Sequence, residues 1–144
     1  MPKFSPKLLR EFFLIIPVLF CCKSMPFNPK SVQQDFVAIG EGGGITGIET
    51  RYFFTISGEV FVQIGLDTVS QKLPSIDRKL VSQTISTIEK LDLINYRYQK
   101  PGNVYKFLEI KLNGQENRIV WGSVNDDVSP VSVSLYQILK QSLE

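Results

Sequence analysis

"IETRYFFTISGEVFVQIG", residues 48–65, is rich in the β-branched and aromatic residues that favour strands. Ser57-Gly58 lies where a tight turn would join two strands, 48–56 and 59–64, into a hairpin. Side chains alternate between the two faces of a strand. One face of the first strand then carries Ile48, Tyr52, Phe54 and Ile56, and the other carries Glu49, Arg51, Phe53 and Thr55. We expect the first face to lie in the core and the second to be largely solvated.

The segments around this hairpin predict further strands and two helices. Strands are expected at 35–40, at 104–112 and at 117–123, with Asn113-Gly114 turning a second hairpin. A helix with an apolar stripe is expected from Ser75, as its N-cap, to about residue 92. Ser129 and Pro130 predict the start of a final helix. The order predicts an α+β fold, with an antiparallel sheet of about four or five strands and two helices.

Composition narrows the possible chemistry of this 144-residue chain. The sequence contains no histidine, which excludes Ser-His-Asp and Cys-His catalysis and histidine-ligated zinc. The net charge is only +2, and three of the basic residues lie within the first ten positions. Nucleic-acid binding is therefore not expected, because its electrostatic footprint is missing.

The first residues resemble a targeting segment. Lys3, Lys7 and Arg10 precede an apolar stretch at 12–22, which as a helix would rise only about 16 Å, against roughly 30 Å of bilayer hydrocarbon. A basic start and a short apolar stretch are typical of a cleaved secretion signal.

"LFCC", residues 19–22, resembles the lipobox of bacterial lipoproteins, in which a small residue precedes a cysteine that becomes acylated. We expect Cys22 to carry the lipid; Cys21 is the alternative, disfavoured because bulky Phe20 would precede it. The resemblance implies a signal peptide at 1–21 and a bacterial cell-envelope protein held to the lipid bilayer by its acylated cysteine, facing the periplasm or the cell exterior. We expect 22–34 to be a flexible tether and 35–144 a single domain. A plain secretion signal with incidental cysteines is the alternative interpretation.

"GEGGGITG", residues 40–47, is the most unusual stretch. It lacks the lysine and the following helix of a phosphate-binding loop, so no nucleotide site is expected. One hypothesis is that the segment forms an edge that meets a protein partner, since glycines permit close backbone approach. The residues of this hypothesis are Glu41, Gly42, Gly43, Gly44, Thr46, Gly47 and Glu49. The alternative is that the glycines only bend the chain so that the sheet can pack.

No catalytic residue, metal ligand or cofactor site is predicted, and the domain is interpreted as a binding module and not an enzyme. The carboxylates are scattered along the sequence in no recognisable catalytic pattern. A hydrolase that uses carboxylates alone, or a purely structural envelope lipoprotein, remain alternatives; the first would need two carboxylates roughly 5–10 Å apart in a cleft.

The segments "GGGITGIETRYFFTISGEV", "IEKLDLINYRYQKPGNVYKFLEIKLNG" and "SPVSVSLYQILKQSL" together resemble the emfourin family. The family's first-strand pattern is matched by Gly43, Gly44, Ile45, Gly47 and Ile48, and its last helix loosely by Pro130 and Leu135. The resemblance implies an inhibitor of thermolysin-like metalloproteases, with a protease cleft as the partner. The chain departs from the family in its lipobox and in the loop "NYRYQKPGN", residues 95–103.

Overall fold

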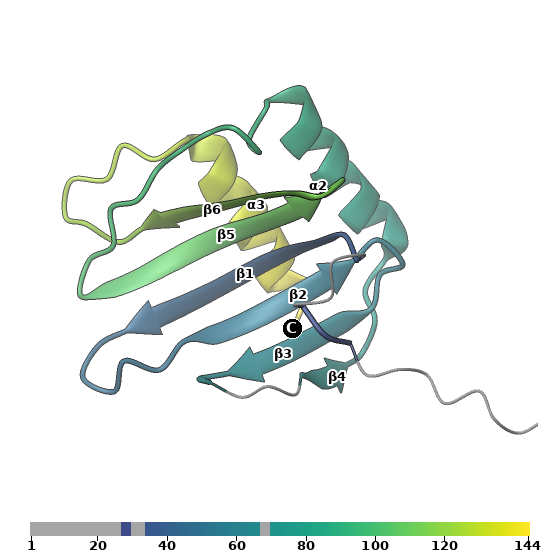
Figure 1. Cartoon of the computed structure of the whole chain (residues 1–144), viewed down its shortest axis with the longest axis horizontal. Helices are drawn as coiled ribbons and strands as arrows, with labels where there is room; N and C mark the ends of the chain where they lie inside the picture. Colours follow the sequence, from purple (N-terminus) through teal and green to yellow (C-terminus); the bar gives the residue numbers. More distant parts are fainter. Residues whose placement is uncertain (1–26, 30–33, 67–69) are drawn as a thin grey trace, which may run out of the picture.

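The chain folds around one antiparallel sheet (Figure 1). The structure is a computed structural model that describes residues 27–29, 34–66 and 70–144. The expected signal peptide, Cys21 and Cys22 lie outside the described residues. In the described part, the sheet has the order β4-β3-β2-β1-β5-β6. Its strands are β1 (Phe36–Gly43), β2 (Thr50–Thr55), β3 (Val60–Ile64), β4 (Gln71–Leu73), β5 (Val104–Leu112) and β6 (Gln115–Trp121).

These strands confirm the predicted α+β fold and both predicted hairpins, β2–β3 and β5–β6. The described residues form six strands, whereas about four or five were expected. The strand that sequence reasoning missed is β4, a three-residue edge strand in which no alternation of polar and apolar residues can be recognised.

Both helices lie on one side of the sheet, and α3 (Pro130–Gln141) crosses behind its central strands (Figure 1). The start of α3 at Pro130 confirms the prediction. The other helix, α2 (Arg78–Lys90), is capped by Asp77, whose side chain accepts a hydrogen bond of 2.8 Å from the Lys79 N–H. The predicted cap at Ser75 is therefore wrong by two residues.

The main core fills the space between the helices and the sheet. The alternation of side chains brings the apolar residues of β1, β2, β5 and β6 onto the face that α2 and α3 cover. Fully buried members of this core are Val37, Ile39, Phe54, Val60, Val81, Ile88, Leu108, Ile110, Ile119 and Leu139. Of the predicted inner face of β2, Phe54 belongs to this core and Tyr52 packs against it.

The sheet face turned away from the helices, here called the open face, has an apolar cluster of its own. Phe27 stacks on Phe61 with ring centroids 4.4 Å apart and also contacts Phe36 and Phe53. Phe27 is only 6% exposed, and Phe53 is fully buried. The expectation that this face of β2 would be largely solvated is wrong at Phe53 and at Thr55, which are both buried. The expectation that Ile48 and Ile56 would lie in the core is also wrong, because both are exposed just beyond the ends of β2. Phe27 belongs to the segment predicted as a tether, and the structure packs it against the domain.

Candidate functional site

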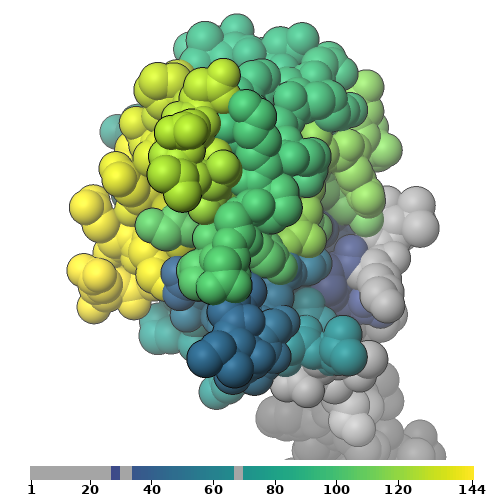
Figure 2. Space-filling view, turned by 90° about the vertical axis from the view of Figure 1, so that its left-hand side faces the viewer, coloured from purple at the N-terminus to yellow at the C-terminus, as the bar shows by residue number. Residues whose placement is uncertain are grey.

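The loops at one end of the sheet meet to form a continuous surface, which we call the loop end: residues 44–49, 65–66, 101–103 and 122–129. Three of the described strands finish at this end (β1, β3 and β6) and three begin there (β2, β4 and β5). The register agrees, since Gly43 lies opposite Val104 and Thr50 lies opposite Ile64. Figure 2 faces this end and shows the blue 44–49 loop below the green and yellow-green loops that follow later in the chain.

Three separate loops each expose an apolar side chain at the loop end. Ile45, Leu66 and Val124 have exposed fractions of 107%, 100% and 99%. Ile48, Ile64 and Val104, which flank them, are each more than half exposed. Single exposed apolar residues are ordinary on a protein surface, whereas a group of them is typical of an interaction site. The loop end is the candidate functional site.

Hydrogen bonds tie these loops to one another. The Gly44 N–H donates to the Asn103 carbonyl, and the Gly65 N–H donates to the Glu49 carbonyl, both over 2.7 Å. In the last loop, the Asp126 carboxylate accepts a hydrogen bond of 2.6 Å from the Gly122 N–H. The first two of these bonds hold the 44–49 loop against its neighbours on both sides.

The residues predicted to bind a partner are divided between the loop end and the sheet interior. Gly44, Thr46 and Gly47 lie in the exposed turn after β1, next to Ile45. Glu41 and Glu49 lie on opposite faces of the sheet. Glu41 faces α3, where Lys140 Nζ lies 3.6 Å from its carboxylate and the Tyr136 hydroxyl lies 3.5 Å away. Burial, together with Glu41, raises the pKa of Tyr136 to about 12.

Gly42 and Gly43 lie at the end of β1, where the strand is paired on one side only. Gly42 lies opposite Tyr105 and Gly43 opposite Val104 in β5, whereas the pairing with β2 ends at Glu41, opposite Thr50. Up to Glu41, β1 is paired on both sides and has no N–H or C=O groups available for a further strand. A partner-binding edge is therefore excluded for β1 up to Glu41 and stays a prediction for Gly42, Gly43 and the turn that follows.

Glycine in β1 makes room for aromatic rings on the open face. A Cβ atom at Gly40 would lie 2.7 Å from Phe107 Cε1 and would also overlap the Thr50 carbonyl oxygen. A Cβ atom at Gly42 would lie 2.8 Å from the Tyr105 hydroxyl. The absent side chains let Phe107 and Tyr105 lie across β1. At Gly40 and Gly42, this close packing favours the alternative that the glycines serve the packing of the sheet.

Beside Phe107, the open face carries a compact ionic network. The Glu49 carboxylate accepts hydrogen bonds from Arg51, Arg118 and the Tyr105 hydroxyl. Burial alone would raise the pKa of Glu49, but these three donors outweigh it and lower the pKa. The Arg118 guanidinium also lies 3.9 Å from the Phe107 ring centroid, a cation–π contact. Glu49, at the base of the glycine-rich loop, thus holds the loop to the sheet.

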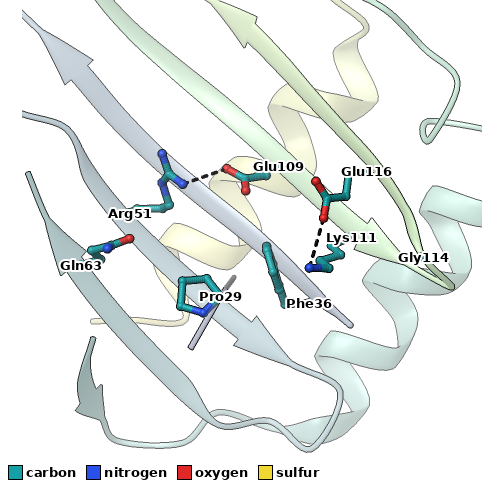
Figure 3. A pocket seen from close by; sticks show the side chains of 8 residues that line it. All are labelled: Pro29, Phe36, Arg51, Gln63, Glu109, Lys111, Gly114 and Glu116. Atoms are coloured by element: carbon teal, nitrogen blue, oxygen red, sulfur yellow. Dashed lines mark ion pairs between the residues drawn. The ribbon is translucent and has the colours of Figure 1, made fainter. Parts of the chain in front are cut away.

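The pKa of Glu109 shifts in the opposite direction, upward. Its carboxylate lies 3.5 Å from Arg51 Nη1, and burial raises its pKa although Arg51 and Arg118 act to lower it. Its Oε2 atom is buried and accepts no hydrogen bond from the described residues. Glu109 also lines a cavity of about 420 Å³ on the open face (Figure 3).

Within the described residues, no group of three or more His, Cys, Asp or Glu side chains is placed to hold a metal ion. On the open face, Glu49 and Glu109 each have an arginine beside them.

Sequence reasoning missed Leu66, Val124 and the open-face network. Leu66 and Val124 lie in mostly polar loops, where the sequence does not distinguish an exposed apolar residue from a buried one. Arg51 on β2 and Arg118 on β6 are far apart in sequence and meet at Glu49 because the sheet places only β1 and β5 between their strands.

No protein-family model matches this chain, and no curated protein matches it significantly. In the described part of the chain, no helix has both the length and the apolar character needed to cross a bilayer.

Proposed function

We propose that this protein is a lipid-anchored binding module of the bacterial cell envelope that captures a protein partner with its loop end. The observation that carries the proposal is the group of fully exposed apolar side chains at the loop end, Ile45, Leu66 and Val124. Burying such side chains against a partner contributes roughly 25 cal/mol per Å² of apolar area.

The position of the chain's entry into the domain supports a protein partner in preference to the anchoring bilayer. Asp35, just before β1, accepts a hydrogen bond of 3.0 Å from the Asn113 N–H, at the turn between β5 and β6. That turn is at the opposite end of the sheet from the loop end. A nine-residue strand such as β5 spans roughly 26 Å. An anchor at Cys22 would therefore leave the loop end free to face away from the membrane.

Binding is favoured over catalysis by the state of Glu49, the carboxylate at the base of the glycine-rich loop. Two arginines hold Glu49, and against the effect of burial these donors lower its pKa. A carboxylate paired with cations in this way is a weaker base than a free one.

The partner surface is tested by crosslinking in intact cells. A photoreactive amino acid at position 45, 66 or 124 should yield the same crosslinked product, whereas one at Lys79 on α2, as the matched control, should not. Thr46→Arg should abolish that product while leaving the melting temperature nearly unchanged, because Thr46 is exposed. Equal crosslinking from position 79, or an unchanged product with Thr46→Arg, would contradict the proposal.

The anchor is tested separately by metabolic labelling with a radioactive fatty acid. The wild type should carry the label and Cys22→Ser should not; absence of label from both would rule out lipidation. The emfourin resemblance adds a specific partner to assay, since a thermolysin-like protease should then be inhibited by the wild type and less by Thr46→Arg.

A further inference from the structure

The cavity on the open face lies away from the loop end and plays no part in the proposed partner binding. Figure 3 shows Arg51 and Gln63 on one side of it and Lys111 and Glu116 on the other, with Pro29 and Phe36 between them. Its volume of about 420 Å³ is within the range of roughly 300–1,000 Å³ that is typical of small-molecule sites.

The charges on the cavity wall balance. Two cations, Arg51 and Lys111, are matched by two anions, Glu109 and Glu116, and the pairs are 3.5 Å and 3.1 Å apart. A strongly charged ligand would be attracted by one member of each pair and repelled by the other. The wall therefore favours a ligand that is polar but carries no net charge.

Both hydrogen-bond donors and acceptors line the same wall. Arginine and lysine only donate, ionised carboxylates only accept, and the Gln63 amide does both. A hydroxyl group donates and accepts, so neighbouring hydroxyls can satisfy such an arrangement. Pro29 and Phe36 add an apolar part against which C–H groups can pack.

Glu109 has unused capacity to accept a hydrogen bond. Its Oε2 atom is ion-paired with Arg51 Nη1 over 3.5 Å but accepts no hydrogen bond from the described residues. Most buried polar atoms in folded proteins take part in at least one hydrogen bond, so this oxygen can accept one more donor. A ligand hydroxyl would supply the donor after a small rotation of the carboxylate.

We propose that this cavity is a binding site for a small uncharged saccharide, with Glu109 and Glu116 accepting from its hydroxyls and Gln63 and Arg51 donating to them. The site goes beyond the proposed function, because it involves another part of the molecule and needs neither the anchor nor the protein partner.

The test is a titration of the isotope-labelled full chain, in a detergent without a sugar headgroup, followed by amide NMR. Cellobiose and N,N′-diacetylchitobiose are the saccharide probes, and glycylglycine is a zwitterionic probe of comparable size. At least one saccharide should give saturable shifts confined to residues around Gln63, Glu109 and Gly114. Gln63→Ala and Glu116→Gln should each weaken its Kd roughly three- to tenfold, the worth of one hydrogen bond.

Lys72→Gln is the matched control. The Lys72 side chain, on β4, also lies on the open face, but it is outside the cavity and is paired with Glu59. Lys72→Gln should leave the Kd unchanged, and the spectra themselves report whether each variant is folded. No saturable shift with either saccharide, tighter binding of glycylglycine, or affinity unaffected by both cavity variants would overturn the proposal.

Discussion

Replacing Gly40 with alanine tests whether the glycines of β1 serve the packing of the sheet. The new Cβ atom would lie 2.7 Å from Phe107 Cε1, closer than real Cβ atoms approach, and would also meet the Thr50 carbonyl. Phe107 is fully buried between Arg51 and Arg118, so its ring has little room to move. Overpacking costs about 1–3 kcal/mol. Each weakened cation–π contact costs about 0.5–1 kcal/mol more.

Against this, alanine lowers the entropy of the unfolded chain, which stabilises by about 0.4–1 kcal/mol. We therefore expect Gly40→Ala to lower the free energy of unfolding by about 2–3 kcal/mol. The assay is urea denaturation followed by the fluorescence of Trp121, the single tryptophan, which packs on Tyr136 with ring centroids 5.5 Å apart.

Gly47→Ala is the matched control. Its φ of +61° strains an alanine, but no atom lies within 4 Å of the added Cβ. We expect Gly47→Ala to lower the free energy of unfolding by only about 1 kcal/mol. In addition, Phe107→Ala combined with Gly40→Ala should cost less than the sum of the two, because the ring that the new Cβ meets has gone. A cost for Gly40→Ala no greater than for Gly47→Ala, or strict additivity with Phe107→Ala, would refute the reasoning.

Three further substitutions test other parts of the molecule. Phe27→Ala should lower the free energy of unfolding by about 2 kcal/mol in the same urea assay. Replacing a buried phenylalanine with alanine usually costs about 3–5 kcal/mol, and the loss is smaller here because the released segment regains conformational entropy. No change would mean that Phe27 does not pack against the domain in solution. Asn117→Ala should lower the free energy of unfolding, measured by calorimetry, by about 2–4 kcal/mol. The Asn117 side chain donates 2.7 Å hydrogen bonds to the Leu93 and Tyr96 carbonyls, which the substitution would leave unpaired. Arg97→Ala, at a nearby exposed position, should lower it far less. Burial raises the pKa of Glu109 above its ordinary 4.5, because the folded state holds the proton more tightly than the unfolded chain does. The wild type should therefore lose stability relative to Glu109→Gln as pH rises from about 4.5 through the raised pKa. A difference in urea midpoints that does not change with pH would contradict this.

Local patterns in the sequence determined the elements of this protein. The alternation in β2 and β5, the turns at Ser57-Gly58 and Asn113-Gly114, and the Ser129-Pro130 start of α3 are each set by residues adjacent in the chain. Such signals depend on backbone preference and periodicity, which act over a few residues. They were sufficient for the α+β class, the hairpins and the helices. They were insufficient for β4, which is too short to show a period.

The arrangement of those elements was decided only by tertiary structure. Whether "GEGG" forms an edge or a central strand depends on β5 pairing with β1 across more than sixty residues of chain, which no local pattern encodes. The same pairing brings Arg118 to Glu49 and places Phe107 over Gly40. The loop end exists because strands of alternating direction bring Ile45, Leu66 and Val124 to one end of the sheet. Contacts of this kind require chain segments to meet in space, so their energies depend on the whole fold and on no single stretch of sequence.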